Sequence, residues 1–126
     1  MDAQVRTTFL MTRAALPLLR DANGAVVNFA SPSGLRATGG MAAYTVGKAG
    51  VVALTRSTAL EEKGNGVRVN AIAPGVVDTE QNREQMGEEA MDWVERDEIV
   101  AAVLFLAGDA GAGVNGETIR VMGRQI

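Results

Sequence analysis

Hydrophobic residues follow two different spacings along this chain, and the changes between them predict its elements. Apolar positions near helical spacing predict a helix from about residue 2 to residue 20. Pro17 lies inside that segment, and we expect it to kink or shorten the helix because proline lacks an amide hydrogen. Residues 25–29 are apolar and β-branched with a single asparagine among them, which predicts a buried parallel strand.

A second long helix is predicted from about residue 42 to residue 63, with a glycine–asparagine–glycine stop directly after it. Its apolar residues occupy much of the circumference, so we expect it to be covered on more than one side. Three small residues on this helix permit the close approach of another backbone: Gly47, Gly50 and Ala53.

The second half of the chain continues the alternation of helices and strands. Four segments are predicted there: a strand at 67–73, a polar surface segment with some helix at 80–95, a helix at 97–108 and a strand at 118–121. Strands that alternate with helices indicate an α/β fold with a parallel, doubly wound sheet. The length of 126 residues predicts a single domain, residues 1–126.

The composition and net charge exclude several kinds of functional site. The net charge of −3 gives no reason to expect nucleic acid or an anionic membrane as a partner. The chain contains no cysteine, which excludes disulfides and thiolate metal sites, and no histidine, the commonest general base and metal ligand. A serine–histidine hydrolase is therefore excluded within this chain, and we expect no metal site. No secretory signal or bilayer-spanning stretch is visible, so a cytoplasmic protein is expected.

The stretch from Ser31 to Lys48 carries the candidate chemistry. Ser31 closes the 25–29 strand, a glycine-rich loop follows, and Tyr44 opens the second helix four residues before Lys48. Tyr44 and Lys48 therefore share a helix face, where the ammonium favours the phenolate form of tyrosine. A serine hydroxyl can hydrogen-bond a carbonyl oxygen as charge develops on it. The alternative is an ordinary buried tyrosine and a solvated lysine.

A second motif, at residues 111–116, matches the G-x-G-x-x-G dinucleotide fingerprint letter for letter. That fingerprint requires a strand before it and a helix after it, so that phosphate meets the helix N-terminus. Here a predicted helix precedes the motif and a predicted strand follows it. We therefore predict a connecting loop instead of a phosphate site.

The spacing of Ser31, Tyr44 and Lys48 resembles the catalytic segment of the short-chain dehydrogenase/reductase family, in which a serine precedes Tyr-x-x-x-Lys by about a dozen residues. The resemblance extends over nearly the whole chain, including the 67–73 strand with its Pro-Gly turn. It implies a partial Rossmann-like sheet of about three strands. It also implies an NAD(P)-dependent oxidoreductase that acts on an alcohol/carbonyl pair.

The resemblance assigns roles to individual residues. Ser31 would polarise the substrate carbonyl, Tyr44 would exchange its proton, and Lys48 would tune the tyrosine and hold the cofactor ribose. Beside Tyr44 and Lys48, four positions are expected to contact the nicotinamide end of NAD or NADP: Pro74, Gly75, the Val77 backbone and the Thr79 hydroxyl.

Other positions depart from the family pattern. Gln4 occupies the place of the family's catalytic asparagine but is one methylene longer, and Met122 stands where an aspartate is usual. The family's glycine-rich turn and its ribose-selecting acid have no counterpart in this sequence. We therefore expect a truncated protein that corresponds to the C-terminal, catalytic half of such an enzyme and is inactive alone.

Two non-enzymatic interpretations stay open, namely a pseudoenzyme that serves as an interaction module and an incomplete gene product. The resemblance implies a small-molecule substrate and a homodimer or homotetramer formed through the helices at 2–20 and 42–63. The strand at 25–29 is expected at a sheet edge, with open hydrogen-bonding groups.

Overall fold

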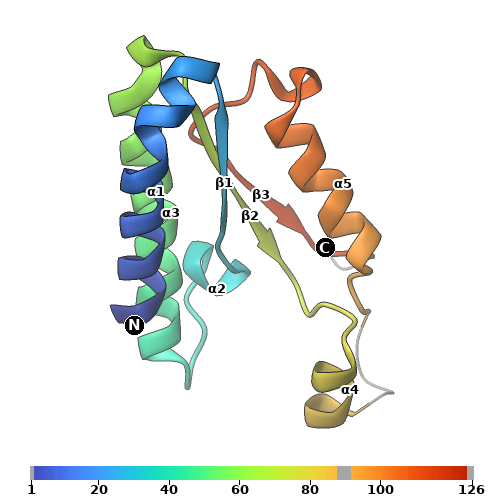
Figure 1. The fold of residues 1–126 in the computed structure, drawn as a ribbon. Coiled ribbons are helices and arrows are strands. Elements are labelled where there is room, and N and C mark those ends of the chain that lie inside the picture. The colour runs from blue at the N-terminus through green and yellow to red at the C-terminus, as the bar shows by residue number, and fades with distance from the viewer. Residues whose placement is uncertain (1, 88–91, 125–126) are drawn as a thin grey trace.

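The computed structural model describes residues 2–87 and 92–124. Its elements in chain order are α1 (Asp2–Ala22), β1 (Ala25–Phe29), α2 (Pro32–Leu35), α3 (Ala42–Glu62), η1 (Lys63–Asn65), β2 (Arg68–Pro74), α4 (Glu80–Met86), α5 (Arg96–Ala107), η2 (Asp109–Gly111) and β3 (Thr118–Val121). The strands pair in parallel in the order β1-β2-β3. Helices α1 and α3 lie on one side of this sheet and α5 lies on the other (Figure 1). The predicted α/β, doubly wound arrangement is confirmed.

The long predicted elements agree closely with the structure, with two differences. Helix α1 continues through Pro17 to Ala22 instead of being shortened. Pro17 is exposed, so water can reach the carbonyl that loses its amide partner. The segment after Ser31 was expected to be a loop, yet it contains α2, because Ser31 caps this short helix and Pro32 suits its first turn.

Within the predicted polar segment at 80–95, helix α4 occupies residues 80–86, and residues 88–91 lie outside the described part of the chain. Val94 is fully buried and forms a parallel bridge with Val77. The segment therefore contributes to the interior as well as to the surface.

Strand β2 forms the centre of the core, and its residues 69–73 are fully shielded from solvent. Val51 and Ala59 of α3 belong to the two clusters that pack on it. The single polar residue of β1, Asn28, is also buried, and its Nδ2 donates to Thr55 Oγ1 at 3.0 Å. Buried polar groups are stable only when they are paired, so this bond fixes β1 against α3.

Hydrogen bonds from side chains of β2 hold the loop between α5 and β3 against the sheet. The Arg68 guanidinium donates hydrogen bonds of 2.7–3.4 Å to the carbonyls of Leu106, Gly108, Gly111 and Val114. The Asn70 side chain donates to the same Val114 carbonyl at 2.8 Å and accepts from the Glu117 amide at 3.0 Å. Residues 111–116 belong to this loop, so the G-x-G-x-x-G segment is a connection between a helix and a strand, as predicted.

An ion pair joins the C-terminal ends of the two long helices. Both side-chain oxygens of the buried Glu62 on α3 accept from the Arg20 guanidinium on α1, one of them at 2.8 Å. Asn65 Nδ2 adds a third donor at 3.1 Å. These hydrogen bonds, that of Arg20 above all, hold the pKa of Glu62 below its usual value.

Two of the three small residues on α3 lie in the interior of the chain or against another of its helices. A Cβ at Gly50 would lie 2.6 Å from Val5 Cγ2 of α1, and Gly47 is buried. Helix α1 is therefore the backbone that approaches α3 at Gly50, and of the three small residues only Ala53 is exposed. Large apolar side chains are nevertheless exposed on the two helices: Phe9, Leu10, Met11, Leu18, Val46 and Leu60. Within the described ranges no helix is both long and apolar enough to cross a membrane.

We expect Arg68→Met to lower the free energy of unfolding by about 2–4 kcal/mol, because several carbonyls lose a charged donor together. Chemical denaturation followed by circular dichroism measures this loss. Arg56→Met, on the exposed surface of α3, is the control and should change stability by less than about 0.5 kcal/mol. Equal losses in the two variants would contradict the fastening role of Arg68.

The pairing of Glu62 predicts a specific loss of stability in acid. Because its pKa is lower in the folded state than in the unfolded state, its contribution is present above the unfolded value and lost as the pH falls. We expect Glu62→Gln to be less stable than the unmodified chain near neutral pH but to lose less stability between about pH 6 and about pH 3. Denaturation curves at several pH values test this, with the exposed neighbour Glu61→Gln as control. A Glu62→Gln variant as acid-sensitive as the unmodified chain would refute it.

Candidate active site

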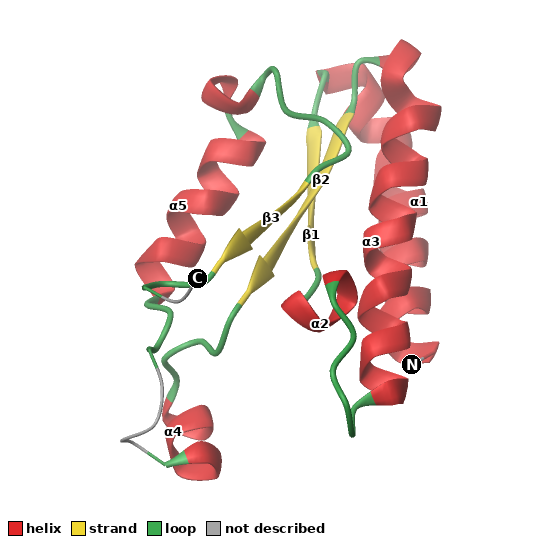
Figure 2. Ribbon diagram, turned by 180° about the vertical axis from the view of Figure 1, so that it is seen from behind, coloured by secondary structure: helices red, strands yellow, loops and turns green. Residues whose placement is uncertain are grey.

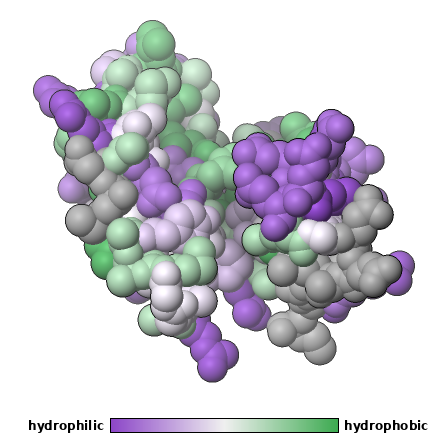
Figure 3. All heavy atoms as spheres, turned by 90° about the horizontal axis from the view of Figure 1, so that it is seen from below, coloured by the Kyte–Doolittle hydropathy of each residue, from purple (hydrophilic) through white to green (hydrophobic). Residues whose placement is uncertain are grey.

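A cavity of about 530 Å³ lies at the edge of the sheet where β1 and β2 end. Its walls are residues 29–33 after β1, residues 74–77 after β2, and side chains of α3 and α4. Seen from this end, the surface is hollowed between the lobe of α1 and α3 and a hydrophilic lobe at α4 (Figure 3). In parallel α/β sheets, ligands bind outside the carboxyl ends of the strands, so this cavity is the candidate site.

The structure brings most of the predicted site residues together. The residues that line the cavity include Ser31, Tyr44, Lys48, Pro74, Gly75 and Val77. Met122, which departs from the family pattern, also lines it. Gln4 and Thr79 are not part of its wall.

Ser31 is held by the local structure that follows it. Its side chain is 7% exposed, and its Oγ accepts from the Ser33 amide at 3.3 Å as the N-cap of α2. A hydroxyl that accepts in this way still has its own hydrogen to donate. A Cβ at Gly34 would lie 2.6 Å from the Lys48 carbonyl carbon, so a glycine is needed for α2 to lie against α3. This close packing places Ser31 beside the face of α3 that carries Lys48.

Tyr44 and Lys48 share one face of α3, as predicted. The Lys48 Nζ lies 5.9 Å from the centroid of the Tyr44 ring, within the range of a cation–π contact. The same Nζ donates to the Phe29 carbonyl at 3.2 Å. An ammonium has three N–H donors, so two stay available for a ligand. Tyr44 is 37% exposed, and its ring therefore faces both α3 and the open cavity.

The side chains of Gln4 and Thr79 lie in different surroundings, away from the cavity wall. The Gln4 Oε1 is buried without a hydrogen-bond partner among the described residues. The Thr79 Oγ1 accepts from the Asn82 amide at 3.1 Å and caps the N-terminus of α4. The relay role of Gln4 and the cofactor contact of Thr79 stay predictions.

The contribution of α4 to the cavity wall was not predicted by the sequence analysis. Asn82 and Met86 of α4 line the cavity, and Asn82 Nδ2 donates to the Val77 carbonyl at 2.8 Å. The segment that contains them is polar and matches no chemical motif, so only the capping pattern at Thr79 could have indicated a helix there.

The wall at 74–77 fits the nicotinamide end of a dinucleotide. The Val76 carbonyl and the Asp78 amide both bond to Val94, at 2.9 and 2.8 Å, so the Val77 peptide faces away from Val94. Val77 therefore directs its amide away from Val94, and Lys48 keeps two N–H groups available. The contacts of both residues with a cofactor stay predictions. Across residues 2–87 and 92–124, no three His, Cys, Asp or Glu side chains gather in a way that could hold a metal ion.

Comparison with known proteins agrees with this geometry. A family model described as enoyl-(acyl carrier protein) reductase matches residues 1–123. Together with the similarity to the relatives described next, this match identifies the class of the protein. The chain belongs to the short-chain dehydrogenase/reductase family.

The curated relatives include two proteins of Xanthobacter autotrophicus with similar names. The chain is 35% identical to 2-(R)-hydroxypropyl-CoM dehydrogenase over 94% of its own length and 52% of that protein. It is 37% identical to inactive 2-(S)-hydroxypropyl-CoM dehydrogenase 2, over 98% of its own length and 60% of that protein. The chain thus spans about half the length of the curated relatives it matches.

Two solved structures share the fold. 4-Hydroxyisoleucine dehydrogenase complexed with NADH superposes with a TM-score of 0.82 and 28% identity, covering 97% of this chain and 56% of that one. ElxO with NADP bound superposes with a TM-score of 0.81 and 26% identity, covering 92% of this chain and 52% of that one. These neighbours support the Rossmann-like assignment.

Proposed function

We propose that this chain is the catalytic part of an NAD(P)-dependent oxidoreductase that interconverts an alcohol and a carbonyl compound. The observation that carries the proposal is that Ser31, Tyr44 and Lys48 line one cavity at the carboxyl ends of two parallel strands. The names of the relatives, which are mostly dehydrogenases and reductases, support the same chemistry.

Each of these side chains has one task in carbonyl reduction. The Ser31 hydroxyl donates a hydrogen bond to the carbonyl oxygen and stabilises the negative charge that develops on it. Tyr44 transfers its phenolic proton to the same oxygen, and the Lys48 ammonium stabilises the phenolate that is left. Oxidation of the alcohol follows the same path in reverse. When bound, a nicotinamide cofactor supplies the hydride or takes it up.

The residues of this chain account for one end of the cofactor only. Lys48, the Val77 amide and the 74–77 wall would hold the nicotinamide and its ribose. We propose that residues 1–126 act as a single domain corresponding to the second half of the family fold. The pyrophosphate and adenosine would then be bound by a nucleotide-binding half, and activity would require it.

A non-catalytic module is the second candidate. One relative of comparable identity is described as inactive, so membership of the family does not by itself confer activity. The intact set of Ser31, Tyr44 and Lys48 in one cavity favours the enzyme.

We also propose a homodimer or homotetramer formed through α1 and α3. Several large apolar side chains are exposed on these two helices, and association would remove them from water. Ala53 is exposed on α3 and offers a small residue at this surface.

The catalytic assignment can be tested in a chimaera in which this chain replaces the matching segment of 2-(R)-hydroxypropyl-CoM dehydrogenase. We expect the chimaera to oxidise an alcohol substrate of that enzyme with NAD or NADP. Tyr44→Phe should abolish turnover, because the phenylalanine ring carries no transferable proton. Ser31→Ala should lower kcat on the order of 100-fold. Lys48→Ala should move the pH–rate profile to higher pH. Steady-state kinetics measure all three effects.

Lys63→Ala is the control for Lys48→Ala, because Lys63 begins η1 beyond the end of α3 and does not line the cavity. A chimaera that binds the cofactor and folds but shows no turnover would favour the non-catalytic module. Near-full activity of Tyr44→Phe would refute the whole assignment.

The oligomer can be tested on the chain itself. Ala53→Arg places a bulky charge on the exposed surface of α3 and should yield monomers or aggregates, whereas Gln85→Arg on α4 should not. Light scattering at tens of micromolar measures the mass. A well-folded monomer of the unmodified chain at that concentration would rule out the proposed association.

A further inference from the structure

Helix α4 is a short element that lies apart from the other helices and strands (Figures 1 and 2). It has seven residues, and none of them is buried. A helix of this length is unstable by itself in water, so specific contacts must hold it in place. Its position matters because Asn82 and Met86 lie one turn apart on it and both line the cavity.

The N-terminal end of α4 is attached to the segment that follows β2. Thr79 caps the helix, and the Asn82 side chain reaches back to the Val77 carbonyl at 2.8 Å. These contacts are local in sequence, so they set where the helix begins. They do not determine which way its far end points.

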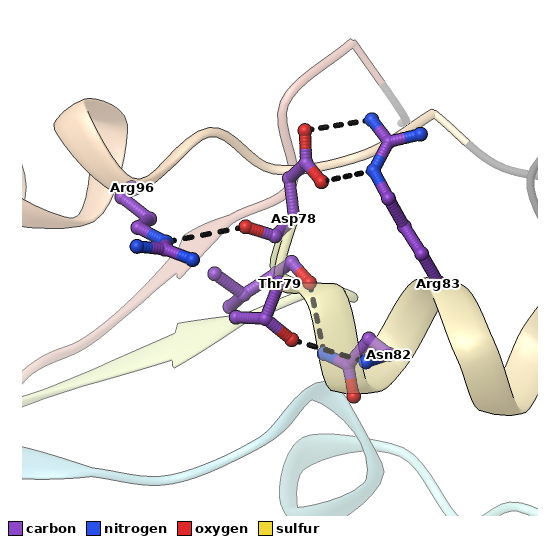
Figure 4. Close-up of polar contacts among 6 residues, drawn as sticks. Asp78, Thr79, Asn82, Arg83 and Arg96 are labelled. Carbon is purple, nitrogen blue, oxygen red and sulfur yellow. Dashed lines mark hydrogen bonds and ion pairs between the residues drawn. The ribbon is translucent and has the colours of Figure 1, made fainter.

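Arg83 adds a second local contact, to Asp78, and one contact with a segment further along the chain, at Trp93. Its Nε and Nη2 donate to the two carboxylate oxygens of Asp78 at 2.5 and 2.8 Å, a bidentate pair (Figure 4). Its guanidinium carbon also lies 5.1 Å from the centroid of the Trp93 ring. Bidentate pairing and stacking on an aromatic face are both specific to the planar guanidinium.

The partners of Arg83 lie on two segments that pair with each other. Val77 and Val94 form a parallel bridge, so the residues next to them, Asp78 and Trp93, belong to two segments that are already joined. The Arg96 Nε donates to the Asp78 carbonyl at 3.3 Å and links these paired segments to α5 (Figure 4). The Arg83 guanidinium also lowers the pKa of Asp78, so the carboxylate stays charged at neutral pH.

We propose that Arg83 is a positioning residue: held by the Asp78 carboxylate and the Trp93 ring, it fixes α4 so that Asn82 and Met86 form the substrate-recognising wall of the cavity. The use of the cavity rests on the proposed function. Among the described residues that line it, Lys48 alone is charged. We therefore expect the part of the substrate that touches Asn82 and Met86 to be an uncharged group.

Trp93 is the single tryptophan of the chain, so its fluorescence reports on this contact without any activity. We expect quenching by acrylamide to rise about twofold or more in Arg83→Met and in Asp78→Asn, because the ring loses the guanidinium that covers it. Arg83→Lys should lie in between, since it keeps the charge but loses the planar fork. Gln85→Met, which adds the same side chain to an exposed position of α4, should match the unmodified chain.

The chimaera supplies the functional measurement. Arg83→Met should raise KM for the alcohol about tenfold with kcat within about threefold, because α4 contacts the substrate and does not take part in proton transfer. Far-UV circular dichroism confirms that each variant folds. Unchanged Trp93 quenching in both Arg83→Met and Asp78→Asn would overturn the proposal, as would a loss of kcat with unchanged KM. An inactive chimaera with the expected quenching pattern would contradict the proposed function and leave the positioning role of Arg83 supported.

Discussion

The parallel pairing of β1 with β2 is the constraint on which the candidate site depends. Its register sets Phe29 beside Ile72, so Ser31, two residues after Phe29, comes level with Pro74 at the end of β2, and both lie at the same edge of the sheet. A slip by one residue would turn every β1 side chain to the opposite face. The buried bond between Asn28 and the threonine of α3 would then be lost, leaving polar groups unpaired in the core.

The two walls of the cavity are held by forces of different kinds. The wall that carries Ser31, Tyr44 and Lys48 rests on close packing of α2 and α3 against the buried strands, which salt hardly affects. The wall formed by α4 rests on a partly exposed ion pair and one cation–π contact, which ionic strength weakens. The residues proposed for proton transfer thus lie on the part of the fold held by close packing, and the residues proposed to select the substrate lie on the part held by ionic contacts.

The sequence predicts what depends on local pattern. The long helices, the three strands and the set of Ser31, Tyr44 and Lys48 follow from periodicity and spacing, and each lies where it was expected. The features that the sequence analysis did not predict depend on contacts between distant segments. Val5 fills the space beside Gly50, and Asn82 and Met86 reach the cavity through a helix whose direction is set by Arg83 and Trp93. No spacing rule within one segment contains that information.

The hydrogen bond between the Lys48 ammonium and the Phe29 carbonyl has a consequence for the entropy of the site. A lysine side chain has several rotatable bonds, and ordering it costs up to about 2 kcal/mol of conformational entropy. Here a backbone carbonyl at the end of β1 restricts those rotations before any ligand arrives. Part of the ordering cost is therefore met when the chain folds, and the ammonium is already oriented when a ligand enters the cavity.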